Sequence, residues 1–307
     1  MSFMDLNLVH LIFSLTLDGF VADSFTLFGL RRVFLVALKR ATCGRLVPCG
    51  ECRSADECEW FPLFGQPLST DPEAVKRHQK PPFPFVFDLP LLLVGPLHCA
   101  DAEIALTLVG SAVAHAGAFV VAMREVCAGE FDDSSLVVTI DSIVSKGVFG
   151  ERIGVEFVRR GGMPANLQVL SVSDVAVKAG GVADKASLSF ITPLRIFHES
   201  KILRRFDGPL FLRGLVRRVS SLVAAYGDGE MTDDFRWLSL RSREVRLTDS
   251  RIRFDTSEGM TTAGIVGEGV LVGDLEPFRP YLLLGEYLHA GKGASWGFGK
   301  FKINDLL

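Results

Sequence analysis

The chain has 307 residues, which is long enough for two domains of ordinary size, each with its own hydrophobic core. Apolar residues make up 48% of it and charged residues 22%, a composition that excludes an intrinsically disordered protein. The formal net charge of −3 argues against indiscriminate binding to nucleic acid but leaves room for a local basic surface.

The amino-terminal stretch is apolar, but it has neither a basic segment nor a small-residue cleavage site of the kind that marks a signal peptide. Asp5 and Asp18 bracket an apolar run that is too short to span a bilayer. We therefore expect a buried strand here, no contact with a membrane, and a cytoplasmic protein.

The first half predicts the order strand, helix, strand, strand, helix, strand. The strands are expected at residues 7–17, 84–89, 102–110 and 135–144, and the helices at 27–41 and 111–126. The first helix has an apolar stripe at steps of three and four, and Lys39 and Arg40 lie off that stripe. They predict a basic outer face, which an ordinary solvated helix surface would also explain.

The second half repeats this order after an irregular connection at 145–184. Strands are expected at 187–196, 235–254, 261–275 and 296–303, with helices over 212–226 and 277–290. Both halves thus predict an α+β fold of tandem ferredoxin-like (RRM-like) βαββαβ domains. The amino-terminal domain would span 1–184, with a cysteine-containing insertion and the connecting segment, and the carboxy-terminal domain 185–307, with a glycine-rich loop.

This loop reads "LHAGKGASWGFGKF" over residues 288–301. A P-loop or dinucleotide fingerprint must follow a strand and open a helix, whereas here a helix precedes the glycines and a strand follows them. Glycine lets a backbone approach a ligand closely, and exposed N–H groups in such a turn bind anions. Lys292 and Lys300 add positive charge, while Trp296 would either stack on a base or pack in the core.

Arginines upstream of the loop favour a phosphodiester ligand, because guanidinium groups pair bidentately with phosphate. Arg213 and Arg217 are spaced i, i+4 with Arg218 beside them, which predicts a basic ridge on the helix. Arg241, Arg243, Arg251 and Arg253 share one parity of the expected strand at 235–254 and so one face, although a solvated face would show the same pattern. The predicted RNA-binding residues are Arg213, Arg217, Arg218, Arg241, Arg243, Gly291, Lys292, Gly293, Trp296, Gly297, Gly299 and Lys300.

The segment "LLLGEYLHAGKGASWGFGKFKI" strongly resembles the terminal motif of the CRISPR-associated RAMP-superfamily endoribonucleases that process precursor crRNA. The segments "TPLRI", "FLRGLVRRVSSL" and the "C…CGEC…C" stretch leading to "PFVFDLP" are also similar to that family. The resemblance implies a metal-independent nuclease that needs no cofactor for catalysis and leaves a 2′,3′-cyclic phosphate after attack by a 2′-hydroxyl. Its implied partners are CRISPR repeat RNA or crRNA and other CRISPR effector subunits, and the alternative is a RAMP subunit that holds crRNA without cutting it.

The family often places a catalytic histidine in or just after the first helix, but this chain has no histidine between Phe20 and Arg77. His289 is therefore the first candidate for the base, with capping of the preceding helix as its alternative role. Lys39 and Arg40 are candidate electrostatic stabilisers, as lysines are in some relatives that lack the histidine. His115 is expected in the core, and His78 and His198 are minor candidates.

Four cysteines, Cys43, Cys49, Cys52 and Cys58, fall within sixteen residues. They would either hold a structural zinc ion or remain reduced thiols in a folded loop. A third class of function, a metal-stabilised protein–protein adaptor, predicts about one zinc per chain and no affinity for RNA.

Overall fold

The computed structural model describes residues 6–43, 45, 49–52, 58–65, 81–129, 135–155, 165–177, 184–227, 233–257 and 259–306. His78 lies outside these residues. The chain divides into two compact units. The amino-terminal unit comprises Asn7–Phe85 and Leu89–Val169, and the carboxy-terminal unit comprises Met1–Leu6, Val86–Asp88 and Leu170–Leu307. The division at residue 169 precedes the boundary expected at 184.

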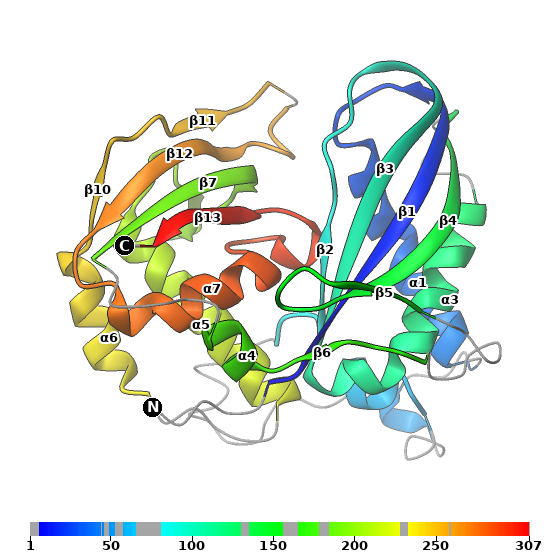
Figure 1. The fold of residues 1–307 in the computed structure, drawn as a ribbon, viewed down its shortest axis with the longest axis horizontal. Helices are drawn as coiled ribbons and strands as arrows, with labels where there is room; N and C mark the ends of the chain where they lie inside the picture. The colour runs from blue at the N-terminus through cyan, green and yellow to red at the C-terminus, as the bar shows by residue number, and fades with distance from the viewer. Residues whose placement is uncertain are drawn as a thin grey trace. The chain divides into compact units, whose positions relative to one another are not determined.

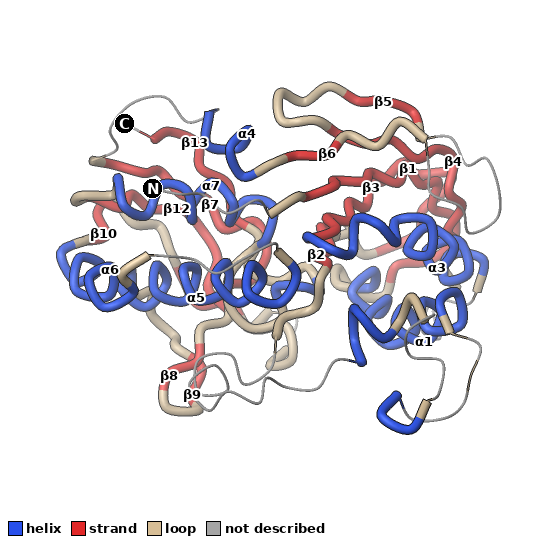
Figure 2. The backbone as a smooth tube through the Cα atoms, turned by 90° about the horizontal axis from the view of Figure 1, so that it is seen from below, coloured by secondary structure: helices blue, strands red, loops and turns tan. Residues whose placement is uncertain are grey.

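The amino-terminal unit is built on an antiparallel sheet in the order β2-β3-β1-β4-β5 (Figure 1). The strands of this sheet are β1 (Leu8–Val21), β2 (Phe85–Asp88), β3 (Gly95–Val109), β4 (Val137–Lys146) and β5 (Arg152–Gly154). Residues Val86–Asp88 of β2 are grouped with the carboxy-terminal unit. Two helices, α1 (Leu30–Thr42) and α3 (Ala116–Ala128), cover one face of this sheet (Figures 1 and 2). Shorter turns of helix are η1 (Thr26–Gly29), η2 (Cys49–Glu51), η4 (Phe61–Gly65) and η5 (Gly110–His115).

The apolar stripe predicted for the first helix is confirmed, since Leu30, Phe34, Ala37 and Leu38 of α1 are buried. The Phe34 ring lies 5.5 Å from the ring of Phe85 and 6.2 Å from that of Phe119 on α3. The segment Gly110–Ala128 is long and apolar enough to cross a membrane by those two criteria, but 56% of it is buried inside the protein. Since α3 packs in the core, this apolar character has a structural explanation.

The carboxy-terminal unit repeats the plan with the sheet order β10-β12-β7-β13, to which β11 is added beside β12. Its strands are β7 (Lys185–Leu194), β8 (Phe197–His198), β9 (Lys201–Ile202), β10 (Arg246–Thr248), β11 (Arg253–Asp255), β12 (Gly264–Val272) and β13 (Phe301–Leu306). The short strand β6 (Val169–Leu170) belongs to the first sheet, where it pairs with β1. Its helices are α4 (Val172–Val177), α5 (Gly208–Tyr226), α6 (Phe235–Arg241), η6 (Ser242–Glu244), η7 (Glu276–Phe278), α7 (Arg279–Leu288) and η8 (Ala294–Trp296).

Helices α5 and α7 lie against one face of this second sheet (Figure 1). Phe211 of α5 packs between Phe190 of β7 and Phe301 of β13, with ring centroids 5.7 and 5.3 Å apart. Each unit therefore has the strand, helix, strand, strand, helix, strand core that was predicted, and in each the third strand lies between the second and the first. The tandem ferredoxin-like α+β fold is confirmed.

The long strand predicted at 235–254 is wrong. Asp234 caps a helix there, because its Oδ1 accepts hydrogen bonds from the backbone N–H groups of Arg236 and Trp237, both at 3.0 Å. The segment is therefore helical through Glu244, and only the short strands β10 and β11 follow. Consequently Arg241 and Arg243 do not share a strand face with Arg251 and Arg253. The last strand also begins later than predicted, at Phe301 instead of Trp296.

Candidate functional site

The glycine loop joins α7 to β13, and its four glycines all adopt positive φ. The angles are 78° at Gly291, 84° at Gly293, 90° at Gly297 and 64° at Gly299. A Cβ on Gly299 would lie 1.9 Å from the carbonyl oxygen of Ala290, and one on Gly291 would lie 2.6 Å from that of Arg195. Glycine is therefore required by the conformation of the loop and by its contact with the chain that follows β7.

Hydrogen bonds fasten the loop to β7 and to the residue that follows it. Gly299 N–H donates to the carbonyl of Pro193 at 3.0 Å, and Lys292 N–H to that of Arg195 at 2.8 Å. The Thr192 hydroxyl donates to the Gly297 carbonyl at 2.6 Å and accepts from the Lys300 N–H at 2.9 Å. Several N–H donors of the loop are engaged in such internal bonds, which leaves fewer of them for a phosphate than the glycine pattern predicted. They belong to Ala290, Lys292, Trp296, Gly297, Phe298 and Gly299.

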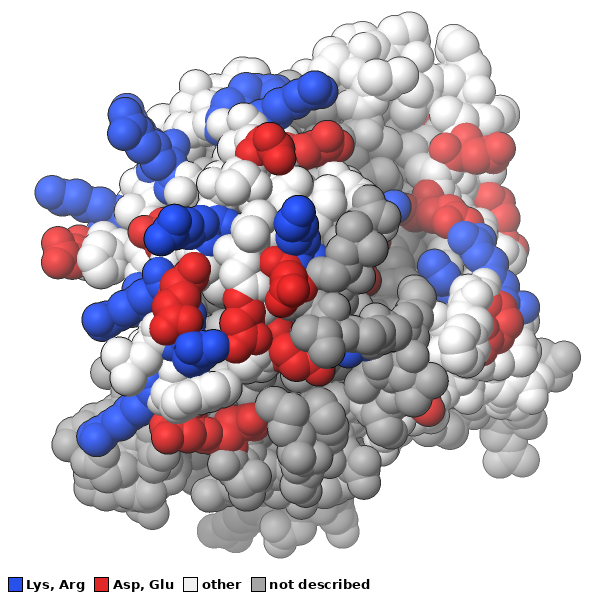
Figure 3. Space-filling view, turned by 60° about the vertical axis from the view of Figure 1, so that its left-hand side comes forward, with Lys and Arg blue, Asp and Glu red and all other residues white. Residues whose placement is uncertain are grey.

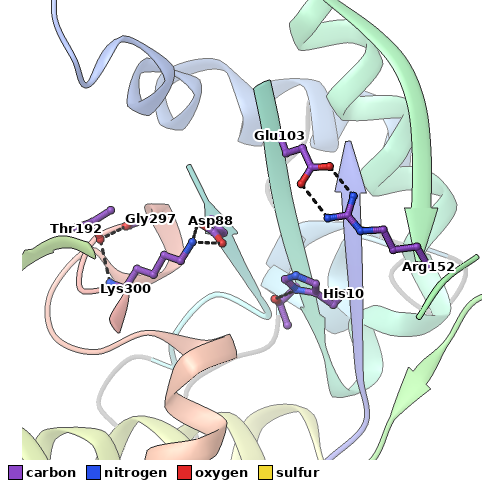
Figure 4. A network of polar contacts seen from close by, with 8 residues as sticks. His10, Asp88, Glu103, Arg152, Thr192, Gly297 and Lys300 are labelled. Carbon is purple, nitrogen blue, oxygen red and sulfur yellow. Dashed lines mark hydrogen bonds and ion pairs between the residues drawn. The ribbon is translucent and has the colours of Figure 1, made fainter. Parts of the chain in front are cut away.

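The side chains of the loop differ in what they offer to a ligand. The Lys300 Nζ lies 2.6 and 2.5 Å from the two carboxylate oxygens of Asp88 (Figure 4), so its charge is matched within the unit. The Trp296 ring is stacked on Phe87 at 5.9 Å, as the packing alternative predicted. Lys292 is exposed, and its Nζ lies 4.7 Å from the centre of the Phe197 ring.

His289 ends α7 and has only 1% of its surface exposed. Its backbone has φ 56° and ψ 176°, and its N–H donates to the carbonyl of Gly285 at 2.8 Å. A general base must reach the proton that it removes. The buried position matches the helix-ending alternative, and a catalytic role for His289 would require the loop to rearrange.

The predicted arginine ridge on α5 is not a single surface. Arg218 points inward, where its Nε donates to the carbonyl of Leu288 at 2.7 Å, and burial lowers its pKa to about 10. The Arg213 Nε donates to the carbonyl of Pro209 at 3.2 Å. Arg217 is exposed and can meet a ligand.

Arg241 is paired with acidic groups on its own unit. It contacts Asp274 and lies 2.7 Å from Glu244, and the hydrogen bond that it donates to Asp274 is the main cause of its raised pKa. Arg243 is exposed. Figure 3, which turns the β10 and α6 side forward, shows acidic side chains interspersed among the basic ones on this face.

In the amino-terminal unit, Lys39 and Arg40 line a cavity of about 600 Å³. Its other lining residues are Leu35, Val36, Cys43, Arg45 and Trp60. The Lys39 Nζ lies 5.9 Å from the centre of the Trp60 ring, and the Arg40 Nη1 lies 2.7 Å from the Glu125 Oε1. The cavity thus combines an aromatic and aliphatic lining with three cationic side chains.

All four cysteines of the predicted zinc site are among the described residues and carry free thiols. Within the described part of the chain, no group of three or more His, Cys, Asp or Glu side chains is placed to hold a metal ion. The zinc site stays a prediction. His115 is partly buried, with Nδ1 3.9 Å from the Glu59 Oε2, and His198 is exposed.

Sequence reasoning did not single out a polar cluster on the sheet face of the amino-terminal unit that α1 and α3 leave open. The His10 Nδ1 lies 2.9 Å from the Thr107 hydroxyl, and Arg152 donates to both oxygens of Glu103 at 2.6 and 3.1 Å (Figure 4). Lys146 pairs across strands with both His10 and Arg152. The period-two alternation of β1 would have placed His10 on this face, but the partners of His10 come from strands distant in sequence.

Two family models match the chain. Residues 188–301 match the CRISPR-associated endoribonuclease Cas6, and residues 21–153 match an amino-terminal domain. The first match covers β7 through the glycine loop, which is the part described above. The carboxy-terminal unit therefore resembles the CRISPR-associated endoribonuclease Cas6. A search of curated protein sequences finds no match.

Solved Cas6 structures share the fold over nearly the whole chain. Cas6 from Thermus thermophilus is 14% identical, with a TM-score of 0.53 and coverage of 97% of this chain and 98% of the other. A Cas6 complex with a substrate mimic is 15% identical, with a TM-score of 0.56 and coverage of 97% of this chain and 99% of the other. In a partial Cas6-RT-Cas1–Cas2 complex the match has a TM-score of 0.61 at 11% identity and covers 99% of this chain but 46% of the longer one.

Proposed function

We propose that this chain binds the repeat RNA of CRISPR transcripts and cuts it to release crRNA. The observation that carries the proposal is the Cas6 match over residues 188–301, where the structure has a hydrogen-bonded glycine loop that contains the exposed Lys292. Arg217 and Arg243, which are also exposed, add positive charge to the same unit. Since both are long, accessible guanidinium groups, they suit contacts with an RNA backbone.

The proposed chemistry is attack by a ribose 2′-hydroxyl on the adjacent phosphorus, without a metal ion. A base removes the 2′-hydroxyl proton as the new P–O bond forms, and an acid protonates the 5′-oxygen as the old P–O bond breaks. The products are a 2′,3′-cyclic phosphate and a 5′-hydroxyl. Lys39 and Arg40, beside the cavity on α1, are the proposed cations for the developing phosphorane charge, and His289 remains a candidate base only in a rearranged loop.

A second candidate function is a subunit that holds crRNA without cutting it. The burial of His289 favours it, as does the absence of histidine from the described helix α1, Leu30–Thr42. Such a subunit would assemble with other CRISPR proteins. Either function would be exercised in the cytoplasm, where we place the protein.

The experiment that separates the two is incubation of the purified protein with its own repeat RNA in the presence of EDTA. Cleavage that leaves a 2′,3′-cyclic phosphate supports the nuclease, and bound but intact RNA supports the holding subunit. Lys39→Ala is expected to slow cleavage by about 100-fold or more, as removal of one stabilising group does in other enzymes. If the His289→Ala variant cleaved the RNA at the wild-type rate, another group would be the base.

A further inference from the structure

We propose that the hairpin formed by β8 and β9 is a platform on which one unpaired base of the bound RNA stacks, with Phe197 as the stacking residue. The inference rests on the proposed RNA-binding function and adds a subsite to it. The hairpin projects from the carboxy-terminal unit below α5 (Figure 2). It is not part of the βαββαβ core.

The hairpin has a defined conformation. Phe197 pairs with Ile202 and His198 with Lys201 across its two strands, and the N–H of Leu203 donates to the carbonyl of Ile196 at 2.8 Å. The two turn residues, Glu199 and Ser200, have φ of 49° and 63°, which is the left-handed geometry of the tight turns that hairpins prefer. For non-glycine residues this backbone conformation costs free energy, so the contacts of the rest of the hairpin must stabilise the turn.

Phe197 presents its ring to solvent, with 40% of the residue exposed. The Lys292 Nζ lies 4.7 Å from the ring centre, within the range of a cation–π contact. The backbone of Lys292 is itself held to Arg195 by the hydrogen bond described above. The ring is therefore positioned by the glycine loop, and its exposed surface is open to a second planar group.

The sequence around Phe197 is basic, which suits the phosphates that flank a base. Residues 195–205 contain four Lys/Arg, namely Arg195, Lys201, Arg204 and Arg205, and one acidic residue, Glu199. An exposed aromatic ring beside a cation, in a basic segment, is an arrangement that binds single-stranded nucleic acid, where bases stack and phosphates pair with basic groups. Bases inside a duplex have both faces covered by their neighbours, so the platform selects an unpaired nucleotide.

The test is binding of repeat RNAs in which 2-aminopurine replaces one nucleotide at a time, measured by fluorescence. Stacking on Phe197 should quench one position in wild-type protein. Phe197→Leu, which keeps an apolar side chain but removes the ring, should abolish that quenching and weaken binding by about 5- to 150-fold. Phe197→Trp should retain both signals, and Phe149→Ala, which alters an exposed phenylalanine of the amino-terminal unit, should match wild type.

The inference would be overturned if Phe197→Leu bound every RNA as tightly as wild type, or if the tightest binding were to fully paired RNA. Loss of binding in Phe197→Leu together with Phe197→Trp would point to a folding defect or a protein-docking role and would likewise contradict the platform. These readouts concern binding alone. A wild-type protein that bound RNA but never cut it would defeat the proposed nuclease and leave the stacking result intact.

Discussion

Arg218 joins three parts of the carboxy-terminal unit through one guanidinium group. It extends from α5 to the last carbonyl of α7, and its Nη2 lies 3.4 Å from the Ser295 hydroxyl in η8. Because carbonyls at a helix end lack partners within the helix, this donor satisfies a group that would otherwise be left without one. We expect Arg218→Ala to lower the free energy of unfolding by about 1–3 kcal/mol, measured by urea denaturation.

The adjacent arginine offers a matched control. Arg217 is exposed on the same helix, so Arg217→Ala should change the free energy of unfolding by no more than about 0.5 kcal/mol. A larger loss in the free energy of unfolding for Arg217→Ala than for Arg218→Ala would show that the contacts of Arg218 do not stabilise the unit.

The Glu103–Arg152 pair predicts a pH dependence. The hydrogen bond from Arg152 lowers the pKa of Glu103 below its usual value of 4.5. The pair therefore contributes stability above the unfolded-state pKa, and that contribution is lost as pH falls through the lower pKa of the folded protein. Arg152→Met should reduce the midpoint of urea unfolding slightly at pH 7 and leave it unchanged near pH 3, whereas an equal reduction at both pH values would contradict the assignment.

Helices α5 and α7 each contain a glycine in the interior, in different surroundings. A Cβ on Gly285 would lie 2.5 Å from the Phe301 Cζ and 3.0 Å from the Leu215 Cδ1, whereas one on Gly214 would meet nothing within 4 Å. We expect Gly285→Ala to destabilise the protein by about 1–3 kcal/mol through overpacking. Gly214→Ala should stabilise it by about 0.5–1 kcal/mol, because alanine favours a helix. Thermal melts should show a lower melting temperature than wild type for Gly285→Ala and a higher one for Gly214→Ala.

The cysteines differ in accessibility from one element to another. Burial in α3 raises the pKa of Cys127 to about 12, so its reactive thiolate is scarce at neutral pH. Cys99 in β3 is exposed, and the four cysteines between α1 and η4 are partly exposed. Under native conditions a thiol reagent should modify these five residues and leave Cys127 intact by mass spectrometry. Protection of Cys43, Cys49, Cys52 and Cys58 that EDTA removes would instead indicate the predicted zinc.

At the scale of the whole molecule, the fold could be predicted because patterns within short stretches of sequence indicate most of its helices and strands. The spacing of apolar residues in α1 and α5 and the alternation in β3 each depend on a short stretch of chain. The exception at 235–254 arose because its arginines alternate with apolar residues as in a strand, while the cap at Asp234 turns the segment into a helix.

The site was less predictable, because its properties depend on contacts between residues far apart in sequence. Lys300 was expected to face RNA but is paired with Asp88, 212 positions earlier. Arg218 and His289 have the residue types of an RNA site, yet Arg218 is half-buried and bonded to the end of α7, and His289 is buried. The conformational freedom of the loop glycines was predicted, and so was the strand at 187–196, whereas the contact of the loop with that strand was not.

Cleavage of the repeat RNA tests the central claim most directly. We predict that the purified protein, in EDTA, cuts its own repeat RNA at one position and leaves a 2′,3′-cyclic phosphate on the upstream product, identified by mass spectrometry. Repeat RNA that carries a 2′-deoxy nucleotide at that position should be bound and stay intact. Repeat RNA recovered whole from wild-type protein, or cleavage only when a divalent metal ion is added, would contradict the account.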